Sequence, residues 1–455
     1  MKTGMTYLFV PFYMTDTELN LQGWEEIEWK TRYFLNYVTN SLYHNSTVYR
    51  LREKTRKDWN LSPMNQILKH HRNTENLEEI DFFFTLEEIN LISFKTHVGL
   101  LVFQLMDQNP NTDLEQAAAF CYEQKKIQKF KGQFLQQPAS PDPISLYSLS
   151  EYLLIQTGII TETEENILFN KHLYHCFFFT YAYCEGTPDT NWKKELFALK
   201  HGYHENFAYI EDSDQTIQNE VFHPMDYIYW SMSSEGIACI SYDLNQETTQ
   251  NFLDGSFFKN LKEQYMPLIV FLLHQKYALY YYLIQFGSGG IEEEDTLRLE
   301  QYGEAIADFK ARYEFQVISE TMQYQNLYDM LRHSFQLDQL FQDLEDKINQ
   351  VSVCLERRQD KIQKEADQRT NKALNGIAFL AVFSALIDGI AWIDYVMTGI
   401  RPGGMHIIKD YGIWFSIFLI LIWIFLSKDV FWGWLRNKKQ TRLENKKGKN
   451  PGNKT

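Results

Sequence analysis

Residues 374–397 read LNGIAFLAVFSALIDGIAWIDYVM, and residues 411–426 read YGIWFSIFLILIWIFL. A helix needs about 20 apolar residues to cross a hydrocarbon layer of about 30 Å, and both stretches qualify as spans. Tryptophans in and just after the second stretch suit a membrane interface. They are Trp414, Trp423, Trp432 and Trp434. We therefore expect an integral membrane protein with two transmembrane helices, and a pair of buried core helices is the alternative.

The segment between the two stretches is a turn, and the chain after them is basic. Residues 400–410 read IRPGGMHIIKD, in which Pro402, Gly403 and Gly404 do not favour helix. Residues 436–455 carry eight Lys or Arg and one Glu. Positively charged flanks stay in the cytoplasm. We therefore expect a multi-pass protein of the cell inner membrane with cytoplasmic N- and C-termini and an outward-facing loop around 399–410.

The remainder of the chain is acidic. The formal net charge of the 455 residues is -15, so the part outside the basic tail carries about -22. Because phosphate contacts need Lys and Arg, such a body is not expected to bind nucleic acid directly. The five cysteines are scattered, as in a reducing cytosolic compartment. The first residues, MKTGMTYLFVPFYM, do not resemble a signal peptide.

Residues 336–370 contain no Pro or Gly and predict a helical stalk. Apolar residues recur along the stalk at spacings of four and three, as in a coiled-coil seam that Arg358 interrupts. The seam consists of Leu337, Phe341, Leu344, Ile348, Val351, Leu355 and Ile362. It fits a helix packed on other helices or on copies of itself, and equally an amphipathic helix lying on its own domain. We expect the helix to continue into the first membrane stretch, because no breaker separates them.

The chain before the stalk mixes strand and helix patterns. Aromatic and β-branched runs predict strands at 6–14, 98–106 and 173–183. Helices are expected at 114–131, 144–157, 261–286 and 292–333. The expected fold class is an α/β cytoplasmic N-terminal domain with a long helical stalk and two C-terminal transmembrane helices. The expected domain limits are 1–260 for a sensor domain, 261–372 for long helices and stalk, 373–435 for the membrane hairpin and 436–455 for the tail.

This layout resembles the CorA-type superfamily of two-transmembrane metal transporters. The stretch ADQRTNKALNGIAFLAVFSALIDGI at 366–390 is similar to the family's entry into its first membrane helix, where Arg-Thr-Asn precedes the pore segment. The resemblance implies a homopentamer whose first membrane helices line a central pore. The family's magnesium-selecting Gly-Met-Asn is replaced here by Tyr395-Val396-Met397. The nearest Gly-Met comes later, in Gly404-Met405-His406, and lacks the Asn.

A branch of the superfamily without this magnesium signature is more similar to the upstream sequence. The chain resembles the CorA-like membrane effectors associated with type III CRISPR systems. The similar stretches are TYLFVPFYM at 6–14, HVGLLVFQL at 97–105, YWSMSSEG at 229–236, MPLIVFLLHQKYAL at 266–279 and VISETMQYQNLYDMLRHSFQL at 317–337. The resemblance implies a channel or pore in antiviral defence, opened by a nucleotide second messenger such as S-adenosylmethionine joined to AMP.

Asp388 lies in the middle of the first membrane stretch. An ionised Asp at that depth costs about 2.5–3.5 kcal/mol, so we expect it to face a pore or a polar partner. On the family's pattern it belongs to a pore-lining stripe. The stripe consists of Asn371, Leu374, Ala378, Ala381, Ala385, Asp388, Trp392 and Tyr395. In an oligomer Asp388 forms a carboxylate ring that attracts cations, and a carboxyl bonded to a neighbouring helix is the alternative.

Candidate ligand contacts follow from the acidity of the domain, because an anionic messenger needs local positive charge or hydrogen-bond donors. They are Ser233, Ser234, Gly236, His274, Gln275, Lys276 and Arg332. The alternatives are an ordinary turn and surface salt bridges. No cofactor, catalytic residue or metal site is expected, because the sequence lacks the common nucleotide-binding, hydrolase and metalloprotease motifs. Four further residues are candidate metal ligands, but side chains along a strand alternate between its two faces, so these four would not converge on one face. They are His172, His175, Cys176 and Cys184.

Three functions remain open from the sequence. The first is a ligand-gated membrane effector that is not an enzyme, and the second is a divalent-cation transporter of the CorA superfamily. The third is a membrane-tethered binding protein that conducts nothing. The missing Gly-Met-Asn argues against transport, and Asp388 on the expected pore stripe argues against a non-conducting tether.

Overall fold

The computed structural model describes residues 1–14, 19–58, 66–70, 80–107, 113–125, 146–159, 176–203, 221–288 and 296–398. Its internal contacts divide the chain into two units, Met1–Leu355 and Glu356–Thr455. The second expected membrane helix, the loop before it and the basic tail lie outside the described residues. The expected limits at residues 260 and 372 stay predictions.

The first unit is built on one mixed sheet, to which the described residues contribute ten strands. The strand order is β2-β3-β5-β6-β1-β7-β10-β9-β8, and β4 pairs with β5. Strands β7 and β10 are parallel, and the other described pairs are antiparallel. The strands are β1 (Thr3–Tyr13), β2 (Trp24–Ile27), β3 (Ser46–Leu51), β4 (Gln66–His70), β5 (Ile80–Phe94), β6 (Val98–Asp107), β7 (Phe177–Cys184), β8 (Val221–Met225), β9 (Ile228–Met232) and β10 (Gly236–Tyr242).

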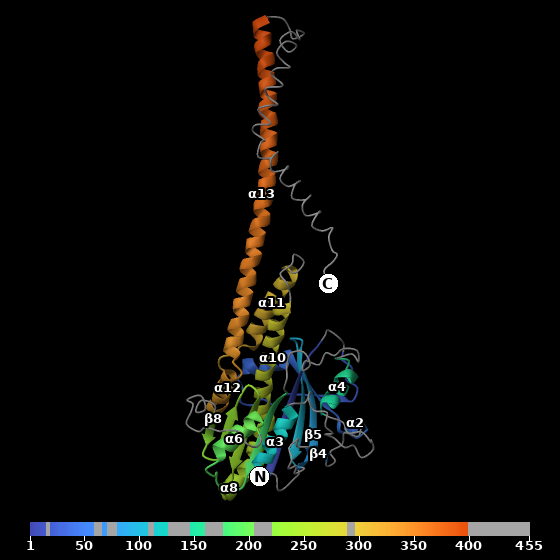
Figure 1. Ribbon diagram of the computed structural model, residues 1–455, viewed down its shortest axis with the longest axis vertical. Coiled ribbons are helices and arrows are strands. Elements are labelled where there is room, and N and C mark those ends of the chain that lie inside the picture. Colours follow the sequence, from blue (N-terminus) through green and yellow to red (C-terminus); the bar gives the residue numbers. More distant parts are fainter. Residues whose placement is uncertain are drawn as a thin grey trace, which may run out of the picture. The chain divides into compact units, whose positions relative to one another are not determined.

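Helices cover both faces of this sheet (Figure 1). Helices α3, α4 and α6 lie on one face, and α1, α10, α11, α12 and the start of α13 pack on the other. The helices are α1 (Asn36–Asn45), α2 (Glu53–Asp58), α3 (Leu114–Lys125), α4 (Leu146–Gln156), α6 (Trp192–His201), α8 (Glu247–Asn251), α9 (Phe258–Asn260), α10 (Met266–Ser288), α11 (Thr296–Tyr313), α12 (Met322–Ser334) and α13 (Leu337–Thr398), with π-helical turns η1 (Phe252–Phe257) and η2 (Leu261–Tyr265).

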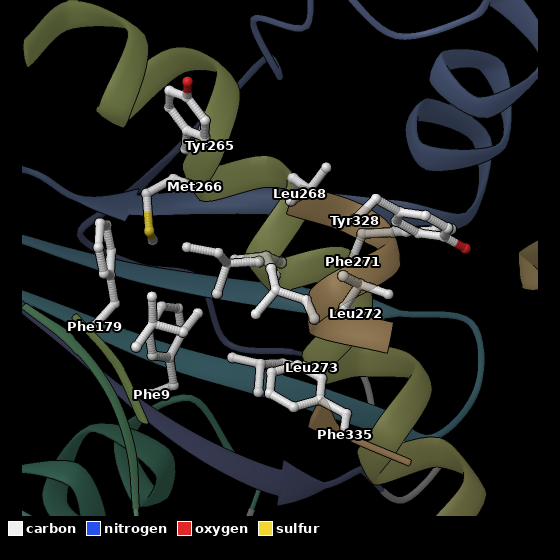
Figure 2. Close-up of a cluster of buried hydrophobic side chains, with 14 of the residues drawn as sticks. Phe9, Phe179, Tyr265, Met266, Leu268, Phe271, Leu272, Leu273, Tyr328 and Phe335 are labelled. Atoms are coloured by element: carbon white, nitrogen blue, oxygen red, sulfur yellow. The ribbon is translucent and has the colours of Figure 1, made fainter. Parts of the chain in front are cut away.

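Because both faces are covered, the central strands are apolar along nearly their whole length. Side chains alternate along β1, so that Tyr7 and Phe9 enter the core beneath α10 and Leu8 enters the core beneath α4. Figure 2 shows leucines of α10, among them Leu272, lying between the sheet and α12. The strands expected at 6–14 and 98–106 are confirmed as β1 and β6, and the described part of 173–183 is strand β7.

Helix α10 forms the central element of this layer. The expected helix at 261–286 is confirmed, since η2 and α10 are continuous over it. Pro267 is the second residue of α10 and directly follows the π-helical turn η2, so its missing N–H falls where the helix changes from π to α geometry. The residues from Leu268 to Leu279 are all buried. Burial of each large apolar side chain stabilises the fold by about 1.5–3 kcal/mol, so α10 anchors the helical layer to the sheet.

The single helix expected at 292–333 is wrong. The structure forms α11 and α12 instead, with a non-helical connector at 314–321. Side chains replace the helical hydrogen bonds there: the Gln325 carboxamide accepts the N–H groups of Ile318 (2.9 Å) and Ser319 (3.4 Å). The backbone N–H of Leu35 donates to the Ile318 carbonyl at 2.8 Å. These partners stabilise the break, which neither Gly nor Pro marks in the sequence.

Helix α13 is one continuous helix of 62 residues (Figure 1). It confirms that the stalk continues into the first membrane stretch. Leu337, Phe341 and Leu344 are buried in the domain core, whereas Ile362 is 62% exposed. The start of the seam therefore packs on its own domain. At the later seam residue Ile362, no other described residue buries the side chain. Among the described residues α13 alone is long and apolar enough to span a membrane, with a mean hydropathy of 2.0 over 18 residues, none buried.

Candidate functional site

Helix α10 presents three consecutive polar side chains inside the core: His274, Gln275 and Lys276. Consecutive helical residues differ by roughly 100° in direction, so the three side chains reach different neighbours. His274 contacts β5 and the turn after it, Gln275 contacts the end of α11, and Lys276 contacts the turn between β9 and β10. The expected ligand contacts on α10 therefore do not converge on one point.

His274 is packed as a neutral core residue. Its Nε2 lies 2.6 Å from the Thr96 hydroxyl, and its ring stacks on Phe94 with centroids 3.8 Å apart. Burial lowers the pKa of His274 to about 3, because the charged imidazolium would lose its water. A neutral imidazole brings no positive charge to an anionic ligand. Gln275 has a structural contact as well, since its Nε2 donates to the Tyr313 carbonyl at 2.9 Å and closes the end of α11.

The β9–β10 turn brings Ser233, Ser234 and Gly236 next to Lys276. The Ser233 hydroxyl accepts the N–H groups of Glu235 and Gly236, both at 3.2 Å, which fixes the turn. A side chain at Gly236 would come within 2.7 Å of the Phe178 ring and the Lys200 carbonyl, so glycine is required. Ser234 is exposed, and its carbonyl oxygen points to the core side, where it accepts the Lys276 ammonium at 2.6 Å.

Lys276 carries an ammonium group into a buried aromatic surrounding. Its Nζ lies 4.9 Å from the ring centre of Phe335 and 5.7 Å from that of Phe177. Burial lowers the pKa of Lys276 from 10.5 to about 8, and the nearby Glu235 opposes this shift. Phe335 is separated from α13 only by Gln336, whose φ of 55° lies in the left-handed region. Lys276 therefore connects the β9–β10 turn to the corner from which α13 begins.

Arg332 forms a second, separate group at the end of α12. Its NH1 donates to the Phe315 carbonyl at 2.9 Å and to the Tyr328 hydroxyl at 3.2 Å. Its Nε and NH2 both face Asp338 in the first turn of α13, at 2.7 and 2.6 Å. Glu314 lies 3.5 Å from the same NH2. Arg332 thus joins α12, the connector and α13.

Sequence reasoning missed Asp338, together with Lys310 and Glu345. Lys310 forms ion pairs with Glu314 of the connector and with Glu345 of α13. Asp338 and Glu345 are seven residues apart, which places them on one face of the helix. Charges on a stalk helix usually face water, and no sequence pattern distinguishes these two from the other acidic residues of α13. Glu314 lies between Arg332 and Lys310 only because the chain leaves the helix at the connector 314–321, and the sequence does not predict that connector.

The expected pore stripe runs along one face of α13. Its residues from Asn371 to Trp392 belong to the continuous helix and are exposed. Their 3-4 spacing keeps them within an arc of roughly 120°. The side chain of Tyr395 lies outside the described residues. Asp388 is in the middle of the stripe and is exposed, as are most described side chains of this segment, so the direction it faces stays a prediction.

The described part of the chain holds no group of three or more His, Cys, Asp or Glu side chains suited to a metal ion. His172 and His175 lie outside it, so the expectation of a metal-free protein stays a prediction. Comparison of the chain with protein-family models, with curated proteins and with solved structures gives no match.

Proposed function

We propose that this chain is the subunit of a ligand-gated membrane channel. A nucleotide second messenger, such as S-adenosylmethionine-AMP, binds the cytoplasmic domain, α13 moves, and a pore lined by the first membrane helix opens. This is the activity of a type III CRISPR-associated effector in antiviral defence. The protein acts by conduction and not by catalysis, as a homopentamer in the cell inner membrane with both termini in the cytoplasm.

The observation that carries the proposal is the course of α13. The helix begins with side chains buried in the core of the sheet domain and continues without a break to a fully exposed apolar segment. A soluble monomer rarely exposes a large contiguous apolar surface, so this segment requires lipid or a partner. A continuous helix is stiff, and a displacement of its buried base is therefore transmitted along it.

The Asp388 stripe gives the pore its expected preference. A carboxylate is costly in lipid and is favoured in a water-filled channel. Rings of Asp side chains in a pore attract cations and repel anions. A cation-conducting pore is therefore favoured over a non-conducting tether. Loss of the Gly-Met-Asn element favours a gated pore over a magnesium transporter.

Reconstitution tests the proposal directly. The full chain is placed in planar bilayers, and current is recorded before and after addition of S-adenosylmethionine-AMP or of cyclic oligoadenylates. We expect one of these ligands to raise cation current. Binding heats measured by calorimetry on the detergent-solubilised chain identify that ligand independently. Absence of both heat and current with every ligand would contradict the proposal.

A further inference from the structure

Arg332 and Asp338 form an ion pair whose two members differ sharply in exposure. The Arg332 side chain is 6% exposed, whereas the Asp338 side chain is 72% exposed. The guanidinium is therefore held in place by the protein, and the carboxylate that covers it reaches in from the surface. Such a carboxylate returns to water easily, while the buried cation needs an anionic partner.

The two edges of the Arg332 guanidinium have different partners. The NH1 group is fixed by the Phe315 carbonyl and the Tyr328 hydroxyl, both of which belong to the surrounding fold. Among the described residues the Nε and NH2 groups meet the carboxylates of Asp338 and, further away, Glu314, and the guanidinium carbon lies 5.9 Å from the ring centre of Phe341. This edge has the parallel N–H geometry that binds carboxylate or phosphate oxygens in pairs.

A second cation lies close to this edge. Lys310 pairs with Glu314 at 3.5 Å, the same distance that separates Glu314 from Arg332. One carboxylate therefore bridges the two cations from the connector side. The α13 carboxylates Asp338 and Glu345 bind the same two cations from the other side. The two cations therefore share one carboxylate, Glu314, and each has a second carboxylate partner on α13.

We propose that the Nε–NH2 edge of Arg332 is the binding site for a phosphate group of the activating ligand, and that Asp338 occupies this site in the resting state. The inference rests on the proposed function for the identity of the ligand class, a phosphate-bearing nucleotide. A phosphate carries more charge and more acceptor oxygens than the carboxylate it replaces. Displaced Asp338 then no longer holds the first turn of α13, next to the left-handed Gln336.

Replacement of Asp338 by Asn tests the exchange without touching the buried cation. Asp338→Asn removes the competing charge at an exposed position, so the domain is expected to fold. The probe is inorganic pyrophosphate, titrated by calorimetry into the full chain in detergent. We expect binding about tenfold tighter in the variant, because one unfavourable anion no longer competes for Arg332.

The matched control is Asp343→Asn. Asp343 is an exposed residue of α13 with no ion pair among the described residues, so the same charge is removed without freeing Arg332. We expect its pyrophosphate affinity to equal that of the wild type. Arg332→Lys keeps the charge and removes the paired N–H groups, and it should weaken binding about tenfold in a chain whose melting curve shows that it is folded.

The outcomes separate this site from the proposed channel. If Asp338→Asn melts at a lower temperature and binds pyrophosphate no better than the wild type, the pair has only a structural role and the inference is overturned. If Asp338→Asn binds tighter and Asp343→Asn does not, the site is supported, even where no variant conducts current in bilayers. In that last case the channel function fails and the anion site remains.

Discussion

Lys276 brings a positive charge into the core of the sheet domain, and its protonation couples to folding. Burial lowers its pKa to about 8 in the folded chain, compared with 10.5 in the unfolded chain. The unfolded state therefore binds more protons between these two values. Stability consequently rises as the pH rises through this window, and the cost of burying the charge is fully present below it.

Replacement of Lys276 by Met makes this cost measurable. The variant is expected to gain stability relative to the wild type at neutral pH and to lose that advantage as the pH rises to about 10. The expected change in the difference is about 3 kcal/mol, given by the pKa shift. Melting curves of the full chain in detergent measure it. Lys347→Met, at an exposed position of α13, is the control and should show no such trend. A difference that does not change with pH would contradict the predicted coupling.

We expect the ion preference of the proposed pore to depend on Asp388. Asp388→Asn preserves the volume and removes the charge, so the cation-to-anion permeability ratio should fall by up to about tenfold, or about 1.4 kcal/mol. Asp394→Asn is the comparison, since Asp394 does not belong to the stripe. Reversal potentials in planar bilayers, with ligand present, measure both. Equal effects of the two variants would show that the pore face is misassigned, and dissociation of the oligomer by Asp388→Asn would assign the carboxyl to helix packing.

The candidate site shows how far single residues can be read from the sequence. Lys276 and Arg332 were identified because an anionic ligand bound by an acidic domain needs local positive charge. Their partners could not be identified, because Ser234 and Asp338 become neighbours only through the β9–β10 turn and the corner at Gln336. Histidine is a residue type that often contacts ligands, but His274 is buried and its ring stacks on Phe94, so it is a core residue.

The helices and strands differ in how well local pattern determines them. Strands β1 and β6 were predicted because their apolar runs are long, and helix α13 was predicted because residues 336–370 lack Pro and Gly, repeat apolar residues at spacings of four and three, and meet the apolar stretch without a breaker. The connector between α11 and α12 was not, since Phe315, Val317 and Ile318 continue an acceptable helical pattern. Its conformation depends on hydrogen bonds from Gln325 and from the chain near α1, more than 200 residues away. Such tertiary contacts override local propensity and leave no signal in the sequence.

The proposed gating requires α13 to be continuous, because the helix must transmit a movement of the domain to the apolar segment. Gln363→Pro interrupts the exposed stretch between the domain and the apolar segment, and proline in a helix interior costs about 3 kcal/mol. Ligand binding by the domain is expected to stay within about twofold of the wild type, whereas ligand-induced current should be lost. Gln363→Ala is the matched control and should conduct normally. Full current through the proline variant would show that α13 does not transmit the movement.

The exposed apolar face of α13 and the exposed Ile362 need lipid or partners that the described chain does not supply, and the resemblance to the CorA-type superfamily implies that the proposed assembly is a homopentamer. Mass measurement of the detergent-solubilised chain, with detergent subtracted, should give five times 54.1 kDa. Ile362→Asp should lower the assembled fraction, since a charge would be placed in the continuing seam. A monomeric wild-type chain would contradict the pore.

The order of the elements along the chain has a consequence for biosynthesis. Helix α10 is a mostly apolar helix of 23 residues and so has the length of a membrane span, although among the described residues only α13 is also apolar enough to be one. All ten described strands precede it, so the sheet surface on which α10 packs is synthesised before α10, whereas α11 and α12, which also contact α10, are synthesised after it. Translation from Ser288 to Leu374, roughly 85 residues, takes roughly 4 to 17 seconds at bacterial rates. The sheet, α10, α11 and α12 therefore have time to pack together before the apolar segment of α13, the candidate membrane span, is complete.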